Sequence, residues 1–361
     1  MKTDDRRMPR RHLLRGAGAT VAGLALTHGA RAAEGEAPVV LRMASSWPTS
    51  LPLLHESALD FARTVRELTA GKILVEVHDP SVHGKPAGIL DLVSSGDYAL
   101  GHTTAQYYAS KLPAIDFFTA VPFGLTPIEL HAWMNEGGGL ELLDRQLAPV
   151  GVRALLAGNT GVQMGGWFAR EIKSVDDLRG LRVRINGFPG RVLARLRCEP
   201  IAMPLGQVAA AFADKRIDAA DIVGPAIDRA MGVAKFAPFY YLPWHEYDVG
   251  LHLFLNRSRI EHLPTGTYEV LRNAAHAAAL RSMARAQFQN AHALRELQHE
   301  GVQLRSFDAQ VLNALRRATE EELAAAMVDK GSAEVIDSWR ASAASMRSYA
   351  STVEVPALAY R

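Results

Sequence analysis

The sequence predicts an α/β fold of two lobes that are braced by one long helix. Predicted strands alternate with predicted helices over residues 39–102 and again over 152–223, and this alternation is typical of α/β units with a largely parallel sheet. A chain of 361 residues is long enough for two packed domains. The alanine-rich stretch 266–300 has few helix breakers. At ~1.5 Å per residue it would form a helix on the order of 50 Å long, enough to cross both lobes.

The first lobe is predicted over residues 33–158, and residues 247–265 complete it. Apolar residues recur at helical spacing before Gly71 and indicate a helix over 55–68. Short apolar runs between turn-forming residues indicate strands. The other elements expected in this lobe are strands at 39–44, 73–78, 96–102, 152–157 and 252–256 and a short helix at 91–95.

The second lobe is predicted over residues 159–246. Ser174 is followed three residues later by Asp177, which is the spacing of a capping box at the start of a helix. A strand over 180–185 ends at the turn-forming pair Asn186-Gly187. The remaining elements expected here are helices at 189–197 and 206–213 and a strand at 217–223.

The C-terminal part is expected to be largely helical. The connecting helix over 266–300 is followed by residues 301–361, which are predicted to hold a strand and two helices, at 309–330 and 332–352.

The N-terminal residues 1–32 have the features of an export signal. A basic region with the pair Arg10-Arg11 precedes a stretch rich in glycine and alanine, and Ala30-Arg31-Ala32 matches a cleavage site. The arginine pair followed by two leucines resembles a twin-arginine signal, with an ordinary Sec signal as the alternative. Export predicts a periplasmic location. No later segment holds 18 consecutive apolar residues, so no membrane-spanning helix is expected.

Most of the positive charge lies in this same segment. The sequence has a net charge of +2, but residues 1–32 carry seven basic and two acidic side chains. The remainder is mildly acidic, which gives no electrostatic reason to expect binding to nucleic acid. The single cysteine, Cys198, can form no disulfide within the chain and is expected to be a buried bystander.

Common catalytic motifs are missing from the sequence. There is no Walker A loop, no G-x-G-x-x-G after a strand and no G-x-S-x-G elbow. His245-Glu246 does not continue into a zinc-protease motif, and His78 and His83 form only a weak metal pair. The chain is therefore not expected to be an enzyme.

Four segments resemble a known family of transport proteins. They are 158–168 (GNTGVQMGGWF), 176–184 (DDLRGLRVR), 217–225 (IDAADIVGP) and 244–246 (WHE). Together they resemble the solute-binding subunit of TRAP (tripartite ATP-independent periplasmic) transporters, of the DctP type. The similarity is to the branch that binds 2-oxo and 2-hydroxy acids with a metal ion, and it covers essentially the whole chain after the export signal.

The resemblance implies a periplasmic-binding-protein-like fold and a transport function. The two lobes would close on a small organic acid and deliver it to the membrane permease subunits of the transporter. A protruding C-terminal helix would support a homodimer.

Arg184 is the expected partner of the ligand carboxylate. It ends a strand, and ligands of α/β lobes bind outside the carboxyl ends of strands. A guanidinium presents a planar fork that matches a carboxylate. Arg182 alternates with Arg184 and fits this pattern equally well; the resemblance selects Arg184.

The resemblance also implies a metal site. The matching ligands are the side chains of Gln163, Asp221 and Glu246 and the backbone carbonyl of Ile222. Two acids would repel an anionic ligand in a water-poor cleft unless a cation lies between them. Oxygen ligands suit a hard cation, so calcium or sodium is expected.

Further residues are expected around the ligand. The resemblance implies a tyrosine hydroxyl from Tyr107 or Tyr108, and the choice between them stays open. Phe188 is a candidate pocket wall, whereas Trp167 and Phe168 are expected to pack in the core.

The sequence departs from the pattern of the branch at two positions. Asp221 stands where the branch often has glutamate, and Ile222 stands where it often has an aromatic residue. A smaller side chain at the second position predicts a ligand larger than pyruvate or lactate.

Three other functions are compatible with the sequence. One is a site without metal that binds a dicarboxylate or sugar acid through Arg184 alone. Another is a periplasmic metal-dependent hydrolase or lyase that uses Asp221, His245 and Glu246. The last is a sensory partner of a signalling protein with the same fold.

Overall fold

The computed structural model describes residues 37–360. The predicted export signal at 1–32 therefore lies outside the described residues. Within them, the strands form two sheets. The strands are β1 (Val39–Ser45), β2 (Ile73–His78), β3 (Leu100–Thr103), β4 (Val152–Asn159), β5 (Gly166–Phe168), β6 (Arg182–Arg184), β7 (Glu199–Ile201), β8 (Ala219–Ala220), β9 (Phe239–Tyr241), β10 (Gly250–Asn256) and β11 (Gln303–Arg305).

Each sheet mixes parallel and antiparallel neighbours. The first has the order β2-β1-β3-β10-β4 and the second has the order β11-β9-β5-β8-β6-β7. In the first sheet β1 is parallel to β2 and β3, and β10 is antiparallel to β3 and β4. In the second, β5 is antiparallel to β8 and β9, while β6 is parallel to β7 and β8. The expected α/β fold is confirmed, but the sheets are less parallel than predicted because β10 and β5 run against their neighbours.

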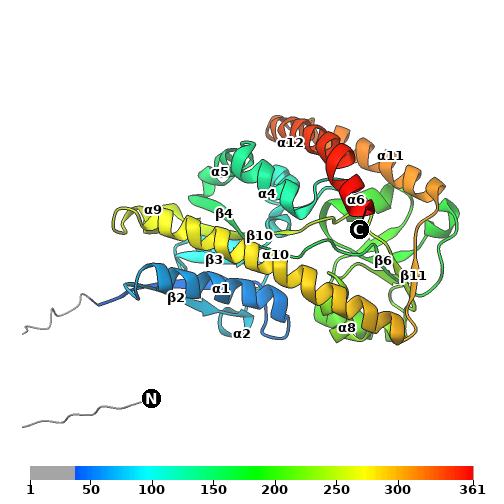
Figure 1. The fold of residues 1–361 in the computed structure, drawn as a ribbon, viewed down its shortest axis with the longest axis horizontal. Helices are drawn as coiled ribbons and strands as arrows, with labels where there is room; N and C mark the ends of the chain where they lie inside the picture. Colours follow the sequence, from blue (N-terminus) through cyan, green and yellow to red (C-terminus); the bar gives the residue numbers. More distant parts are fainter. Residues whose placement is uncertain (1–36, 361) are drawn as a thin grey trace, which may run out of the picture. The chain divides into compact units, whose positions relative to one another are not determined.

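Helices pack around these sheets (Figure 1). They are α1 (Pro52–Leu68), α2 (Pro80–His83), α3 (Ile89–Ser94), α4 (Pro127–Glu136), α5 (Gly139–Leu147), α6 (Gly187–Arg195), α7 (Val208–Ala213), α8 (Pro225–Met231), α9 (Arg257–Glu261), α10 (Thr267–His299), α11 (Ala309–Ala326), α12 (Lys330–Tyr349) and α13 (Val355–Ala359).

The helices α4 and α5 were not predicted, although the start of α4 carries a local signal. Thr126 and Glu129 form a capping box, in which the backbone and hydroxyl of Thr126 both donate to the Glu129 carboxylate at 2.8 and 2.9 Å. Pro127 follows at the first helical position, where its missing N–H costs nothing. The predicted capping box of Ser174 and Asp177 is present as well, but it opens a single 3₁₀ turn.

The predicted long helix is α10, which contacts α1 and β4 of the first sheet and α8 beside the second. Figure 1 shows it crossing the described part of the chain from α1 to α8. Four alanines, Ala274, Ala275, Ala278 and Ala279, are fully buried on one face. Their small side chains let the helix approach its neighbours closely. Toward its other end, the side chain of Asn290 accepts a hydrogen bond from the Ala226 amide of α8 at 3.0 Å.

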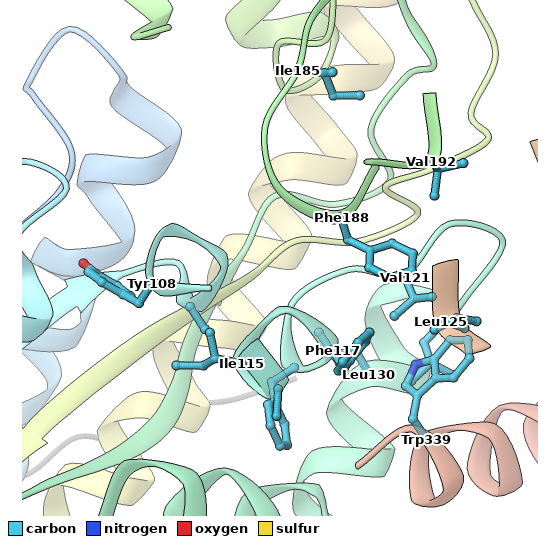
Figure 2. Close-up of a cluster of buried hydrophobic side chains, with 14 of the residues drawn as sticks. Tyr108, Ile115, Phe117, Val121, Leu125, Leu130, Ile185, Phe188, Val192 and Trp339 are labelled. Carbon is cyan, nitrogen blue, oxygen red and sulfur yellow. The ribbon is translucent and has the colours of Figure 1, made fainter. Parts of the chain in front are cut away.

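A continuous apolar core joins residues from both sheets. Figure 2 shows Ile115, Phe117 and Val121, which lie between β3 and β4 in the chain, near Phe188 and Val192 of α6. The rings of Phe117 and Phe188 meet edge to face, with their centroids 5.6 Å apart. Trp167 and Phe168 are also buried in the core.

The C-terminus is helical, with a π-helical turn over Ala350–Glu354 between α12 and α13. Apolar side chains are exposed along this end, among them Tyr349, Val353, Leu358 and Tyr360. None of the helices in the described part of the chain is both long and apolar enough to span a bilayer.

Candidate functional site

A cavity of about 470 Å³, part of it open to solvent, lies where strands of both sheets end. Trp47 follows β1, the segment 104–107 follows β3, and Thr160 and Gln163 follow β4. The second sheet contributes residues from the ends of β6 and β8. The lining residues are Trp47, Leu54, Thr104, Gln106, Tyr107, Thr160, Gln163, Arg184, Asn186, Leu205, Asp221, Ile222, Val223, Glu246, Val249 and Leu251.

Six of the eight residues predicted from the sequence line this cavity. They are Tyr107, Gln163, Arg184, Asp221, Ile222 and Glu246. The strand predicted over 217–223 is shorter than expected, because β8 ends at Ala220. The chain leaves the sheet at Asp221, so three consecutive residues reach the cavity.

Tyr108 and Phe188, two of the predicted residues, are not among those that line this cavity. Tyr108 is buried, and its hydroxyl lies 3.0 Å from the Thr103 hydroxyl. Its ring packs against Phe254 instead. Phe188 is buried on Phe117, as Figure 2 shows. In a 3₁₀ turn neighbouring side chains point in different directions, and of the two tyrosines Tyr107 is the one that lines the cavity.

Arg184 is almost fully buried and is held rigidly by backbone oxygens. Its Nε donates to the Met203 carbonyl at 3.1 Å, and its Nη1 donates to the Asp221 carbonyl at 2.6 Å. Nη1 also lies 3.6 Å from the Asp221 carboxylate. A guanidinium has five N–H donors, so these two bonds leave three on the Nη atoms for an anion. Arg182, the other candidate, instead pairs with Asp218 at 2.7 Å.

Asp221, His245 and Glu246 form a buried cluster whose ligand atoms lie within 4.8 Å of one another. His245 Nε2 lies 3.1 Å from Asp221 Oδ1. Burial, and then the charge of Asp221, raise the pKa of the Glu246 carboxyl well above its usual range. Two adjacent buried carboxylates are costly unless a positive charge lies near them. Arg184 supplies part of that charge, and a bound cation would supply the rest.

Gln163 adds an oxygen that fits a cation. Its Nε2 donates to the Thr160 hydroxyl at 3.1 Å, which orients the side-chain amide. Its Oε1 is buried and has no hydrogen-bond partner in the described part of the chain. The Gln163 backbone amide donates to the Glu246 carbonyl at 3.1 Å, which brings the two segments together. A buried oxygen without a donor, in the same cavity as two acids, fits a hard cation.

Sequence reasoning missed several lining residues, including Trp47, Thr104, Thr160, Asn186 and Leu205. Most directly follow a predicted strand, and ligands bind at the carboxyl ends of such strands. Strand ends therefore carried a usable signal. Trp47 is fixed because its indole Nε1 donates to His102 Nδ1 at 2.8 Å, a contact between segments 55 residues apart.

The sequence of this chain is similar to those of known solute-binding proteins. The sequence pattern of the family described as bacterial extracellular solute-binding protein, family 7 (DctP), matches residues 43–330. A protein of Nostoc sp., described as a monocarboxylate 2-oxoacid-binding periplasmic protein, is 35% identical over 305 residues, or 83% of each chain.

Solved structures of TRAP periplasmic solute-binding proteins are similar to this chain over most of its length. One from Colwellia psychrerythraea, with bound calcium and pyruvate, has a TM-score of 0.87 and 34% identity over 90% of this chain and 100% of its own. One from Pseudoalteromonas atlantica, with sodium and pyruvate, has a TM-score of 0.86 and 35% identity over 89% and 98%. One from Bordetella bronchiseptica, a dimer with calcium and picolinate, has a TM-score of 0.86 and 30% identity over 90% and 97%.

Proposed function

The chain belongs to the DctP family of bacterial extracellular solute-binding proteins, and on that premise we propose that it binds a small 2-oxo or 2-hydroxy monocarboxylic acid together with a cation. It acts in the periplasm, where residues 1–32 direct it, and delivers the acid to the membrane permease of a TRAP transporter. The Nostoc relative described as 2-oxoacid-binding and the related structures with bound pyruvate and calcium or sodium support this assignment.

One observation carries the proposal: a single cavity is lined both by the Arg184 guanidinium, which keeps N–H donors for an anion, and by a buried set of oxygens from Gln163, Asp221 and Glu246, of which Gln163 Oε1 has no hydrogen-bond partner in the described residues. Arg184 binds the ligand carboxylate through its Nη atoms. Gln163 Oε1, the Asp221 and Glu246 carboxylates and the Ile222 carbonyl hold the cation. The bound cation supplies positive charge for the carboxylate and the 2-oxygen of the ligand, and oxygen ligands of this kind favour calcium or sodium.

The charges of the cavity favour a monocarboxylate over a dicarboxylate. Among the described residues that line it, Arg184 is the one lysine or arginine. A second ligand carboxylate would find no further basic side chain and would face Asp221 or Glu246. The apolar residues Leu54, Leu205, Ile222, Val223 and Leu251 line the remaining wall. They suit the hydrocarbon part of an organic acid.

The two sheets are proposed to belong to two lobes that close on the ligand, with α10 as the common brace. The exposed apolar residues of α12 and α13 are proposed to support a homodimer.

An enzymatic role would use His245 as a base beside Asp221 and Glu246. The Asp221 carboxylate contacts the Nε2 of His245 at 3.1 Å, but His245 is fully buried and is not among the residues that line the cavity, which leaves it poorly placed to accept a substrate proton. Incubation with bound 2-oxo acids and mass spectrometry tests this alternative. Turnover of a bound acid would establish a hydrolase or lyase; recovery of the intact acid is expected.

Native mass spectrometry of freshly purified protein, followed by calorimetry with pyruvate, tests the proposal. We expect an organic acid and a metal ion to be released together. After chelation the affinity for pyruvate should fall about tenfold or more, and added calcium or sodium should restore it. Unchanged affinity in the chelated protein would instead support the metal-free alternative.

A further inference from the structure

The segment between β8 and α8 places three consecutive residues, Asp221, Ile222 and Val223, on the cavity wall. The first residue, Asp221, is held by two hydrogen bonds to Arg184. The Asp221 amide donates to the Arg184 carbonyl at 2.9 Å, and the Asp221 carbonyl accepts from Arg184 Nη1 at 2.6 Å. The other end is held by a residue outside the cavity. The Val223 amide donates to Oδ1 of Asp228 at 3.1 Å.

The contact at Val223 determines the direction of the Ile222 carbonyl. The Val223 N–H and the Ile222 C=O belong to the same peptide group, which is planar and trans, so the two bonds point in opposite directions. No cis peptide bond occurs in the described residues. With the N–H directed at Asp228, the carbonyl oxygen must point away from Asp228. An acceptor on the N–H also polarises the peptide group and increases the negative charge on its oxygen.

Asp228 is itself held in a fixed orientation. It is fully buried, and its second oxygen, Oδ2, accepts hydrogen bonds from Trp167 Nε1 at 2.9 Å and from the Tyr240 hydroxyl at 2.8 Å. The two aromatic rings are stacked with centroids 4.0 Å apart. They come from β5 and β9, adjacent strands of the second sheet. The carboxylate is thus anchored to the sheet through one oxygen and to the cavity segment through the other.

We propose that Asp228 is a positioning residue of the cation site, which turns the Ile222 carbonyl away from the sheet and toward the cation through its bond to the Val223 amide. This inference rests on the proposed function, since Ile222 contributes its carbonyl to that site. Asp228 does not touch the ligand or the cation. A buried acid with only a structural role would affect the stability of the fold. A positioning role predicts in addition that loss of the acceptor at Oδ1 weakens cation binding.

A matched pair of double variants isolates that acceptor. The background is Trp167→Phe, which removes the donor that would clash with an amide at position 228. In this background, Asp228→Asn keeps an oxygen for the Val223 N–H and can donate its NH₂ to the Tyr240 hydroxyl. Asp228→Leu keeps the branched shape and the number of side-chain heavy atoms but has no acceptor. Neither variant has the carboxyl group; they differ in the hydrogen bond to Val223 and in the bond to the Tyr240 hydroxyl, and the effect of losing the latter alone is measured in the control Trp167→Phe/Tyr240→Phe, which keeps Asp228.

Calcium binding to the chelated full-length mature protein, without organic acid, is measured by calorimetry, and folding is checked by thermal unfolding. We expect the Asn variant to stay within about threefold of the Trp167→Phe background, and the Leu variant to bind calcium about tenfold more weakly or worse, as for other partners of metal ligands. If the Leu variant lacks a cooperative transition, Asp228→Ala in the same background takes its place.

Equal calcium affinities in the two double variants would overturn the role of Asp228 and leave the proposed function standing. Failure of the wild-type protein to bind calcium or sodium, with or without pyruvate, would overturn the proposed cation site and this inference with it. A loss of affinity that simply follows the loss of thermal stability in both variants would also count against positioning.

Discussion

The carboxylate of Asp116 accepts a hydrogen bond from Nη2 of Arg191 at 3.0 Å, and this pair joins a connection between strands of the first sheet to a helix that follows a strand of the second. Asp116 lies in a 3₁₀ segment, Pro113–Phe118, between β3 and β4, whereas Arg191 lies on α6 after β6. Asp116 is fully buried. Helix α6 begins at Gly187, which lies close to both Asp116 and the cavity-lining residue Gln106. If Gly187 carried a Cβ atom, that atom would lie 3.8 Å from Asp116 Oδ1 and 3.9 Å from the Gln106 side chain. The ion pair therefore lies close to the part of the cavity wall that Gln106 forms.

We expect Arg191→Gln to speed ligand release. The substitution leaves a buried Asp116 without its cation, which weakens the contact between the two sides of the cavity. Stopped-flow measurement of pyruvate dissociation should show a rate increase of about tenfold, with less change in the association rate. Arg195→Gln is the matched control, because Arg195 pairs with the same Glu322 as Arg191 and makes no hydrogen bond to Asp116. Equal dissociation rates in the two variants would contradict a role for the ion pair in holding the site closed.

Substituting Arg184 by lysine should weaken ligand binding although the charge is kept. Lysine cannot reproduce the planar fork that donates to the Met203 and Asp221 carbonyls and still presents donors to a carboxylate. Hydrogen bonds to charged groups contribute about 1.5–3 kcal/mol, so the dissociation constant for pyruvate should rise about tenfold or more. Calorimetry at saturating calcium measures this. Arg182→Lys, on the same strand but paired with Asp218, should change the affinity little; a comparable loss there would point to general destabilisation.

The wall at Ile222 should admit acids longer than pyruvate. Ile222 lines the cavity, and the family resemblance implies that an aromatic residue is frequent at this position, so the smaller side chain is expected to leave more room for a ligand side chain. A thermal-shift panel of 2-oxo acids at constant calcium concentration should show longer or branched acids stabilising the protein at least as well as pyruvate. Ile222→Phe should reverse this order and leave its response to pyruvate nearly intact. Preference of the wild-type protein for pyruvate over every longer acid would contradict the prediction.

The protein should lose stability on mild acidification through its buried histidines. Burial lowers the pKa of His102 to about 4. A lowered folded-state pKa means that the unfolded chain takes up the proton first, so stability is present above pH 6.5 and is lost as the pH falls toward 4. For His102 alone the loss by pH 5 is about 2 kcal/mol. Denaturant unfolding from pH 7.5 to 5 should show a smaller loss in His102→Gln, which keeps an acceptor for the Trp47 indole. An identical pH dependence in that variant would show that His102 is not the source.

Much of the fold could be predicted from local patterns. The strands over 39–44, 73–78 and 152–157 and the helix over 266–300 correspond closely to β1, β2, β4 and α10, because their apolar periodicity and turn residues are properties of adjacent positions. The resemblance to the TRAP solute-binding family is confirmed by the family match over residues 43–330. It also selected Arg184 over Arg182, which local pattern alone could not do.

Other features depended on contacts between distant parts of the chain. The side-chain directions of Tyr107 and Tyr108 differ, and only the packing of Tyr108 against Phe254 shows which of them is excluded from the cavity. The antiparallel insertion of β10 between β3 and β4 pairs residues about 100 to 150 positions apart. No local pattern records such a pairing.

The amino-acid sequence by itself determined the α/β class, the long helix, the family and the residue types available for binding. The tertiary structure decided which of those side chains share one cavity, and it brought Asp228 into contact with the segment 221–223. The reason is physical: helix and strand periodicity depends on neighbouring residues, whereas the direction of a carbonyl or carboxylate in a buried site depends on partners that folding brings from far along the chain.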